Sequence, residues 1–445
     1  MDVLVDTILL LIGAAIVFSF AGAEIMKRIG IPQILGFMLA GVLLALTGLF
    51  SAEMRVSLYP VVDLALGLIG YNIGIEIRKD VFRGRVRQMS TVLILESILT
   101  FIIVTLLASW ITGQVYLAVV LGAVAAATDP ASTVMVIWEH HCKGNLTDTL
   151  MFVLALDDVV AILLANVSIS IAVVAYMVPG TLSLIEMLFA TTFEIVISAL
   201  VGGLIGFGMV YFINAEENRG RLLELELGAI ILLVGLMAFF EISPILSCMS
   251  FGFVVGNWTE PSKDPVNHTL KTIMTPIVMI FFAYVGASID LSVLFLPAVL
   301  ILAAAYVLGR SIAKYVGAFA GAKISQMPSV TQKYLGFCLM SQAGVAVGLT
   351  LVVERSFLAL NNPEATAAGI LILNVVAMTT MVLQVVGPIS AQIGLQRAGE
   401  TPRDFAARID KACLDDGDSL LDEASADTSA NVGLPETDSG DSLDQ

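Results

Sequence analysis

The 445-residue sequence is poor in charge. Only 13% of its residues are Asp, Glu, Lys or Arg, whereas 58% are hydrophobic. Soluble domains usually carry about 25% charged residues, so this composition is typical of a polytopic membrane protein. The sequence also lacks a basic patch interleaved with aromatic residues, which makes nucleic acid an unexpected partner.

Cysteine and histidine are also scarce. The four cysteines are scattered and lack the spacing of a zinc site or a disulfide framework: Cys142, Cys248, Cys338 and Cys413. No nucleophile–base pair or metal motif is present either, so we expect neither enzymatic activity nor a cofactor. His140 and His141 form the one histidine pair. They are either solvated loop residues or a pH sensor, because histidine titrates near neutral pH.

Long hydrophobic runs fill most of the chain. A bilayer core of about 30 Å requires about 20 apolar residues per helix. The runs therefore predict an all-α protein with thirteen transmembrane spans, at 6–27, 32–50, 58–77, 89–111, 114–138, 147–177, 183–213, 222–240, 243–257, 268–288, 291–319, 333–353 and 366–394. No basic residue precedes Lys27, so the first run is unlike a cleaved signal peptide.

The basic residues predict the orientation of these spans. If the N-terminus is outside, the external loops contain only Arg55 and Arg355, and nearly all other Lys and Arg residues fall in cytoplasmic segments. This bias follows the positive-inside rule. We therefore expect a multi-pass protein of the cell (inner or plasma) membrane, with its N-terminus outside and its C-terminus in the cytoplasm.

Thirteen spans divide into six, one and six, which gives the two six-helix halves opposite orientations. This is the layout of an inverted-repeat transporter. The fifth span of each half carries polar, helix-weakening residues, Thr128-Asp129-Pro130 and Ser341-Gln342-Ala343-Gly344. We expect two discontinuous helices that cross near the membrane midplane, where such transporters bind their substrate. Small residues there also suit close helix packing.

Two adjacent acids, Asp157 and Asp158, interrupt the sixth span. A charge at the bilayer centre costs roughly 3 kcal/mol or more, so such acids are functional candidates. Asp158 lies roughly 16 Å along its span, near mid-depth. Its carboxylate can hold a proton, or it can bind Na⁺ or another alkali cation, which prefers oxygen ligands. One site that holds either ion but never both, combined with alternating access, is sufficient for antiport.

The first broken span offers further oxygens. Pro130 cannot complete the helical ladder, so it should free a carbonyl near residue 126 that a cation can use. Thr128 adds a hydroxyl group. Asp129 either neutralises the positive end of the following half-helix or binds the ion directly, and we favour the first role.

Two bases, Arg310 and Lys314, share one face of the eleventh span. Opposite charges in a low-dielectric interior should pair. We expect one acid of the Asp157–Asp158 pair to bind one of these bases, which leaves the other acid, Asp158, for the ion. Glu96 in the fourth span either pairs with the bases or lines the cation path, and we favour pairing. For Glu76 we favour an ion pair at the cytoplasmic surface.

These motifs resemble the monovalent cation:proton antiporter superfamily. The likeness covers most of residues 10–395 and depends on Ala127-Thr-Asp-Pro-Ala131 and Leu156-Asp-Asp-Val-Val-Ala161. Supporting matches are Ile31-Pro-Gln-Ile-Leu-Gly-Phe-Met-Leu-Ala-Gly41, Phe281-Phe-Ala-Tyr-Val-Gly286 and Gly309-Arg-Ser-Ile-Ala-Lys-Tyr-Val-Gly317. The Asp-Asp pair is similar to that of the bacterial and archaeal Na⁺/H⁺ antiporters regarded as electrogenic.

The resemblance implies specific roles. Asp158 would bind the cation and the proton, and Asp157 would pair with a base, for which Lys314 is the first choice over Arg310. It also implies a homodimer in which scaffold helices flank a moving core. The corresponding segments are scaffold 1–88, core 89–178, linker helix 179–221, scaffold 222–288 and core 289–395.

The last segment and the substrate remain to be assigned. Residues 396–445 carry more than half of the net charge of −16, and we expect an acidic, disordered cytoplasmic tail. Three alternatives to Na⁺/H⁺ exchange stay open: K⁺/H⁺ exchange, symport of an organic anion of the bile-acid type, and a cation channel.

Overall fold

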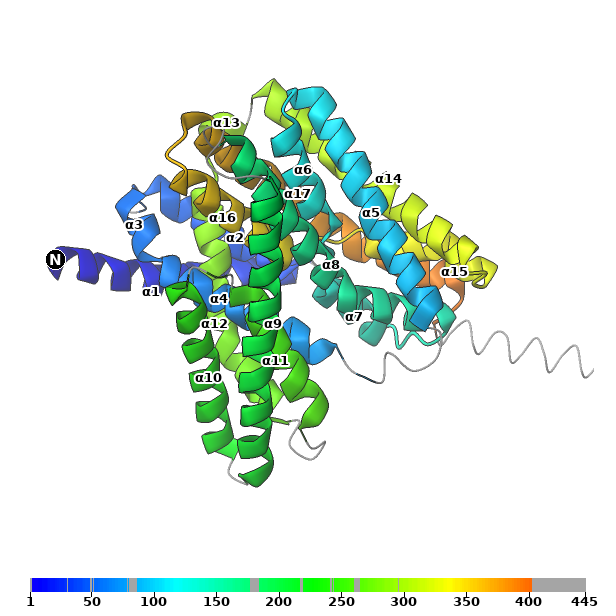
Figure 1. The fold of residues 1–445 in the computed structure, drawn as a ribbon, viewed down its shortest axis with the longest axis horizontal. Coiled ribbons are helices and arrows are strands. Elements are labelled where there is room, and N and C mark those ends of the chain that lie inside the picture. Colours follow the sequence, from blue (N-terminus) through cyan, green and yellow to red (C-terminus); the bar gives the residue numbers. More distant parts are fainter. Residues whose placement is uncertain are drawn as a thin grey trace, which may run out of the picture.

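The structure is a computed structural model, and it describes residues 2–401 with several gaps. The residues left out within this range are 30, 49, 51, 78, 80–85, 177–183, 217–218, 241, 243, 260–264 and 295. The described part of the chain folds into helices joined by short connections (Figure 1). The expected all-α architecture is therefore confirmed.

Each predicted span coincides with a helix or with two helices that flank a break. Among the described residues, eight helices are long and apolar enough to cross a membrane, and a ninth crossing results if one bent pair counts as a single span. Three shorter apolar helices, at Gln33–Leu46, Pro244–Trp258 and Thr272–Ser288, fall below that length. The count of thirteen crossings and the inverted repeat therefore remain predictions.

One group of helices packs through glycines. It contains α1 (Asp2–Arg28), α2 (Gln33–Leu46), α4 (Tyr59–Glu76), α11 (Pro244–Trp258) and α12 (Pro265–Ser288). A Cβ atom at Gly41 of α2 would collide with the backbone of Ala283 in α12, and one at Gly286 of α12 would collide with the backbone of Met38. Small residues thus allow the backbones to touch. Such close packing is usual in membranes, because the hydrophobic effect does not drive helices together in lipid.

A second group surrounds the two broken helices. Its continuous members are α5 (Val86–Thr112), α8 (Asn145–Tyr176), α14 (Pro297–Ile324) and α17 (Pro363–Ala398). Helices α5 and α14 lie side by side along most of their length (Figure 1). The broken helices are α6 (Val115–Ala126) with α7 (Pro130–Glu139), and α15 (Ser329–Tyr334) and η3 (Leu335–Leu339) with α16 (Gly344–Ala359).

Helix α9 (Leu184–Ala215) contacts α11 of the first group and α8 of the second. Its glycine run approaches α11, because Gly202 abuts the backbone of Ser247 and Gly206 abuts Val254. Helix α10 (Arg219–Phe239) packs beside α9, α4 and α11. The remaining short helices, α3 (Ala52–Ser57) and α13 (Leu291–Leu294), lie in connections.

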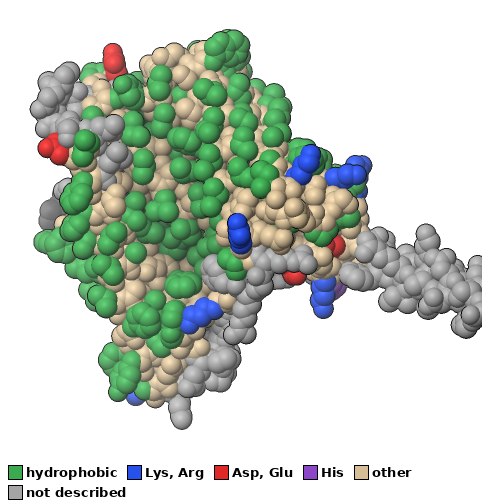
Figure 2. Space-filling model, turned by 45° about the vertical axis from the view of Figure 1, so that its right-hand side comes forward, with side chains coloured by type: hydrophobic (Ala, Val, Ile, Leu, Met, Phe, Trp, Pro, Cys, Tyr) green, Lys and Arg blue, Asp and Glu red, His purple; other side chains and the backbone are tan. Residues whose placement is uncertain are grey.

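The outer surface is apolar over a broad area. Figure 2 shows hydrophobic side chains spread across one face, with Lys and Arg gathered along one border of it. Large side chains such as Trp110, Ile185, Phe189 and Leu204 are at least 70% exposed. Soluble monomers rarely expose so large an apolar surface, whereas contact with lipid accounts for it.

Several predicted boundaries differ from the structure by four to six residues. The eleventh span begins at Pro297 instead of residue 291, because the short helix α13 and Pro297 interrupt the apolar run. The last span continues to Ala398, where Gly399 adopts a left-handed conformation that ends the helix. Glu400 is also fixed, since its carboxylate accepts hydrogen bonds from the backbone N–H groups of Leu146 and Thr147 at 2.8 Å. The rest of the predicted tail, 402–445, lies outside the described residues.

Glu226 in α10 is a buried acid in an apolar environment. Its side chain is 0% exposed, and within the described part of the chain neither carboxylate oxygen has a hydrogen-bond partner. Leu222 and Ile230, one turn away on either side, belong to the surrounding hydrophobic cluster. A buried polar group without a hydrogen bond costs about 1–3 kcal/mol.

We therefore expect Glu226→Leu to raise the melting temperature of the purified protein in detergent by a few degrees. The matched control is Glu224→Leu, which changes an exposed acid of the same helix and should have little effect. A lower melting temperature for Glu226→Leu would show that this carboxyl group stabilises the protein.

Candidate functional site

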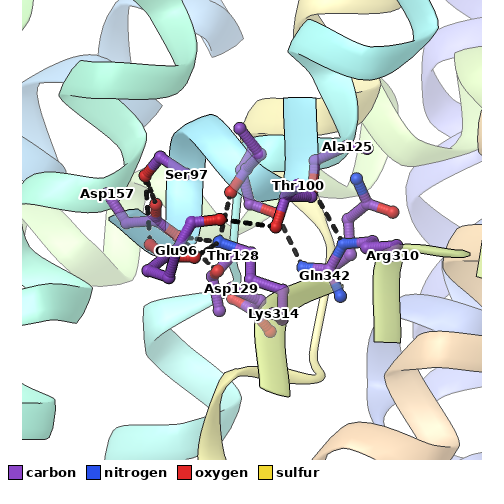
Figure 3. Close-up of polar contacts among 12 residues, drawn as sticks. Glu96, Ser97, Thr100, Ala125, Thr128, Asp129, Asp157, Arg310, Lys314 and Gln342 are labelled. Carbon is purple, nitrogen blue, oxygen red and sulfur yellow. Dashed lines mark hydrogen bonds and ion pairs between the residues drawn. The ribbon is translucent and has the colours of Figure 1, made fainter. Parts of the chain in front are cut away.

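The breaks in the two discontinuous helices lie against each other. The chain leaves α6 at Ala126 and enters α7 at Pro130, and it leaves η3 at Leu339 and enters α16 at Gly344. The backbone N–H of Asp129 donates to the carbonyl of Ser341 at 3.2 Å, and the Ser341 hydroxyl donates to the carbonyl of Asp129 at 3.0 Å. The segments that the sequence singled out therefore meet in the interior (Figure 3).

The two bases of α14 bind the carbonyl ends of the breaks. Arg310 donates to the carbonyls of Ala125 at 3.0 Å and Ala127 at 2.8 Å on one side. On the other side it donates to Met340 at 2.7 Å and Ser341 at 2.9 Å. Positive charge at the C-terminal end of a helix is favourable, and here it also satisfies carbonyls that have no helical partner.

The carbonyl that Pro130 frees has a different partner from the one expected. The sequence predicted a free carbonyl near residue 126 that a cation can use. The carbonyl of Ala126 instead accepts from the Lys314 ammonium at 2.5 Å. Arg310 and Lys314 thus occupy the carbonyls of Ala125, Ala126 and Ala127 at the end of α6. Arg310 likewise forms no ion pair within the described residues.

Asp129 lies at the N-terminal end of α7. One of its oxygens accepts from the backbone N–H of Ala131 at 3.2 Å, and the other accepts from the Ser132 hydroxyl at 2.5 Å and the Gln384 amide at 2.9 Å. This is the geometry of a helix cap, with negative charge at the positive end of the half-helix.

Sequence reasoning missed several further polar residues at the breaks, among them Tyr306 and Gln384. Tyr306 accepts a hydrogen bond from the Gln342 amide at 2.9 Å, and Gln342 also donates to the carbonyl of Val124 at 3.0 Å. Gln384 of α17 donates to the carbonyl of Gln342 at 2.9 Å. A usable signal existed for Tyr306, which lies one turn before Arg310 on the same helix face. Gln384 is separated from the other motifs in sequence and gave no such signal.

Asp157 is enclosed by donors. One oxygen accepts from the Lys314 ammonium at 2.8 Å and from the Thr128 hydroxyl, and the other accepts from the Ser97 hydroxyl at 3.1 Å. Lys314 also forms an ion pair with Glu96 at 2.7 Å. The side chains of Glu96, Asp157 and Lys314 are all fully buried. Figure 3 shows these residues converging from α5, α8 and α14.

Asp158 has a contrasting environment. It is fully buried, yet neither of its oxygens has a hydrogen-bond partner among the described residues. It lines a cavity of about 200 Å³ together with Thr128, Asp129, Asn72 and Glu76. An acid placed beside such a cavity is available to a proton or a cation.

The cavity also involves Glu76, which the sequence assigned to the surface. Glu76 accepts from the Asn72 amide at 3.1 Å, and both residues line this cavity and a neighbouring one of about 370 Å³. The neighbouring cavity also contains Met135, which is 68% exposed. Space therefore extends from the surface of the protein toward Asp158.

An all-α polytopic membrane protein with buried acids at two crossed helix breaks has the design of an ion-coupled transporter. A family model described as the transmembrane sodium/hydrogen exchanger matches residues 14–391. The chain therefore belongs to the sodium/hydrogen exchanger family, within the monovalent cation:proton antiporters. The predicted superfamily is confirmed, and so is the prediction that the protein is a transporter and no enzyme.

Individual relatives agree with the family. The chain is 24% identical over 365 residues to a Na⁺/H⁺ antiporter of Enterococcus hirae, which covers 78% of this chain and 90% of that protein. It is 25% identical over 349 residues to the high-affinity Na⁺/H⁺ antiporter NhaS3 of Synechocystis, and the aligned region covers 68% of this chain and 73% of that protein. The structure of the sodium proton antiporter MjNhaP1 of Methanocaldococcus jannaschii superposes with a TM-score of 0.74 at 17% identity. That match covers 89% of this chain and 98% of the other, and it extends the agreement to the fold.

Arg310 offers a test of how the breaks are stabilised. Lysine keeps the charge but lacks the planar guanidinium group with its five donors, so Arg310→Lys leaves one or two buried carbonyls without a donor. We expect it to lower the free energy of unfolding by about 2–4 kcal/mol. The measurement is thermal unfolding in detergent.

The control for Arg310→Lys is Lys323→Gln, which changes an exposed base near the end of the same helix. If Arg310→Lys unfolded at the wild-type temperature, the four carbonyl contacts would be irrelevant to stability.

Proposed function

We propose that the protein is a secondary active antiporter that exchanges Na⁺ for protons, electrogenically and by alternating access. In this proposal the cation and the proton compete for Asp158. Asp157, Thr128 and Asp129 shape the site around it, Lys314 and Glu96 balance its charge, and Arg310 holds the backbone at the breaks.

The contrast between two adjacent acids carries the proposal. Asp157 is enclosed by a lysine and two hydroxyl groups, whereas the oxygens of Asp158 lie beside a cavity and have no hydrogen-bond partner in the part of the chain that the structure describes. An unpaired ionised carboxylate is costly in the interior. Asp158 therefore binds either a proton or a cation whenever the site is shut off from water, and the protein moves only while one of them is bound. That restriction couples the two fluxes.

The cavity and the ionic contacts favour this reading over the other classes. An organic anion would meet Asp158, Asp129 and Glu76 in the cavity wall, all of which repel it. A channel requires an open path on both sides of the site. Whether the exchanged cation is K⁺ instead of Na⁺ can be decided by measuring pH-gradient dissipation in proteoliposomes with each alkali cation.

The first test is Asp158→Asn. Asparagine keeps the size of the side chain but can neither take up a proton nor balance a cation. We expect dissipation of a pH gradient by Na⁺ in proteoliposomes to fall to the level of empty vesicles. The matched control is Asp148→Asn, an exposed acid on the same helix, which should exchange as the wild type does. Exchange by Asp158→Asn at the wild-type rate would refute the proposed role of Asp158.

The two sides of the site differ in the structure. The cavities adjoin Glu76 at the end of α4 that leads into the basic segment 78–87, the side that the charge bias assigns to the cytoplasm. At the opposite end of α4, Asp63 forms an ion pair with Arg355 of α16. The Arg355 guanidinium also lies 3.9 Å from the ring centre of Tyr59. We therefore propose that the structure is an inward-facing state, closed on the outside by a contact between scaffold helix α4 and core helix α16.

The outer contact can be tested with a cysteine at the cavity. Ala131 is exposed and lines both cavities, so Ala131→Cys should react with a water-soluble thiol reagent in the inward-facing state. Adding Asp63→Asn removes the outer ion pair and shifts the population away from this state. We expect the labelling rate to fall by about twofold or more.

The control for the labelling experiment is Glu24→Gln in the same Ala131→Cys background. It breaks an exposed ion pair with Arg28 in α1 and should leave labelling unchanged. Unchanged labelling in Asp63→Asn would mean that Asp63 and Arg355 do not hold the outer side closed.

The family resemblance also supports a homodimer, formed by scaffold helices within 1–88 and 222–288, with cores at 89–178 and 289–395. We propose that the dimer lies in the cell membrane with its C-terminus in the cytoplasm. The broad apolar surface and the border of basic residues are compatible with that placement (Figure 2).

A further inference from the structure

Lys314 is shared between two carboxylates. Its ammonium lies 2.7 Å from Glu96, 2.8 Å from Asp157 and 2.5 Å from the carbonyl of Ala126. The ammonium donates hydrogen bonds to Asp157 and to Ala126, whereas its contact with Glu96 is an ion pair without hydrogen-bond geometry. Ordinary charge balance needs only one acid for this lysine, and the structure supplies two. With both acids ionised, the three buried side chains carry one net negative charge.

Ser97 joins the same two acids from the other side. Its hydroxyl oxygen lies 3.1 Å from the second oxygen of Glu96 and 3.1 Å from the second oxygen of Asp157. A hydroxyl group has a single proton and can donate to only one of these oxygens at a time. If both acids are ionised, the other contact joins two acceptors. One added proton on Glu96 resolves this, because Glu96 then donates to Ser97 while Ser97 donates to Asp157.

The surrounding groups do not neutralise this net negative charge. Helix α8 contributes Asp157 and Asp158, and α14 contributes Lys314 and Arg310, of which Arg310 is committed to backbone carbonyls. Helix α6, which also packs against α5, contributes only Tyr116, in its first turn at the end far from Ala126. No further base in the described part of the chain contacts Glu96.

Thr128 connects these acids to the cavity. Its side chain lines the cavity with Asp158, and its hydroxyl donates to Asp157. A cation bound by Asp158 and the Thr128 oxygen would make the Thr128 O–H a stronger donor, since hydrogen bonds in a chain polarise one another. Ionised Asp157 would then be better stabilised, and a proton shared with Glu96 through Ser97 would be held less tightly.

We propose that Glu96 holds a second exchangeable proton, which leaves when a cation binds at Asp158. This inference rests on the proposed antiport and deepens it, because it assigns the second proton of an electrogenic cycle to Glu96. One proton leaves Asp158 as the cation arrives, and the other leaves the O–H of Glu96, so two positive charges are exchanged for one.

The experiment counts the protons released when Na⁺ binds to the full-length purified protein, over a series of pH values, with a pH-indicator dye in weak buffer. We expect a maximum of about two protons per bound cation for the wild type and about one for Glu96→Gln, because glutamine keeps the shape but cannot release a proton. Glu96→Asp should restore about two, and Asp148→Asn, which changes an exposed acid of α8, should also give about two. The count requires no turnover, so a variant that binds Na⁺ without transporting it is still informative.

The outcomes separate this inference from the proposed function. A wild-type protein that neither binds Na⁺ nor releases a proton would overturn both. A count of about one proton in the wild type would refute the second exchangeable proton but not the exchange at Asp158. A count of about two in Glu96→Gln would have the same meaning, because the second proton would then come from another group. If Glu96→Gln fails to fold, Ser97→Ala replaces it, since this change removes only the bridging hydroxyl. Release of the second proton should then move to lower pH, and an unchanged pH profile would overturn the inference.

Discussion

Backbone N–H and C=O groups at a helix break inside a membrane cannot form hydrogen bonds with water. The rest of this structure depends on which protein groups form those hydrogen bonds instead. Two helices are interrupted at the same place, so several carbonyls and N–H groups lose their helical partners there. Arg310 binds four of the carbonyls, Lys314 binds a fifth, and Asp129 caps one of the N-terminal ends. The buried bases are therefore explained by the broken backbone before any ion is considered.

This use of the bases determines which acid is available. Lys314 satisfies Ala126 and, with the same ammonium, holds Asp157 and Glu96. Asp158, the next residue along α8, points in a different direction, because successive residues of a helix are about 100° apart. Two identical side chains thus acquire different roles from their positions on one helix. One is fixed by a structural ammonium, and the other is left beside the cavity.

Much of this arrangement could be predicted from the sequence, for identifiable reasons. Apolar runs of about 20 residues located the helices, because lipid thickness imposes that length. Pro130 and the run Ser341–Gly344 located the breaks, and intramembrane charge identified Asp157, Asp158, Arg310 and Lys314. Partners were harder to predict. The family resemblance favoured Lys314 over Arg310 as the base for Asp157, but the choice depends on how α14 packs against α6 and α8. Gln384 and the cavity position of Glu76 were missed for the same reason, since each depends on contacts between segments far apart in the chain.

The central claim is that H⁺ and an alkali cation occupy one site in turn. Its most direct test is the dissociation constant of Na⁺, measured by calorimetry on the purified wild-type protein at a series of pH values. Competition predicts that the apparent dissociation constant rises by about tenfold or more for each unit of falling pH once protons occupy the site. A dissociation constant that stays the same across that range would contradict the account, because the cation and the proton would then bind independently.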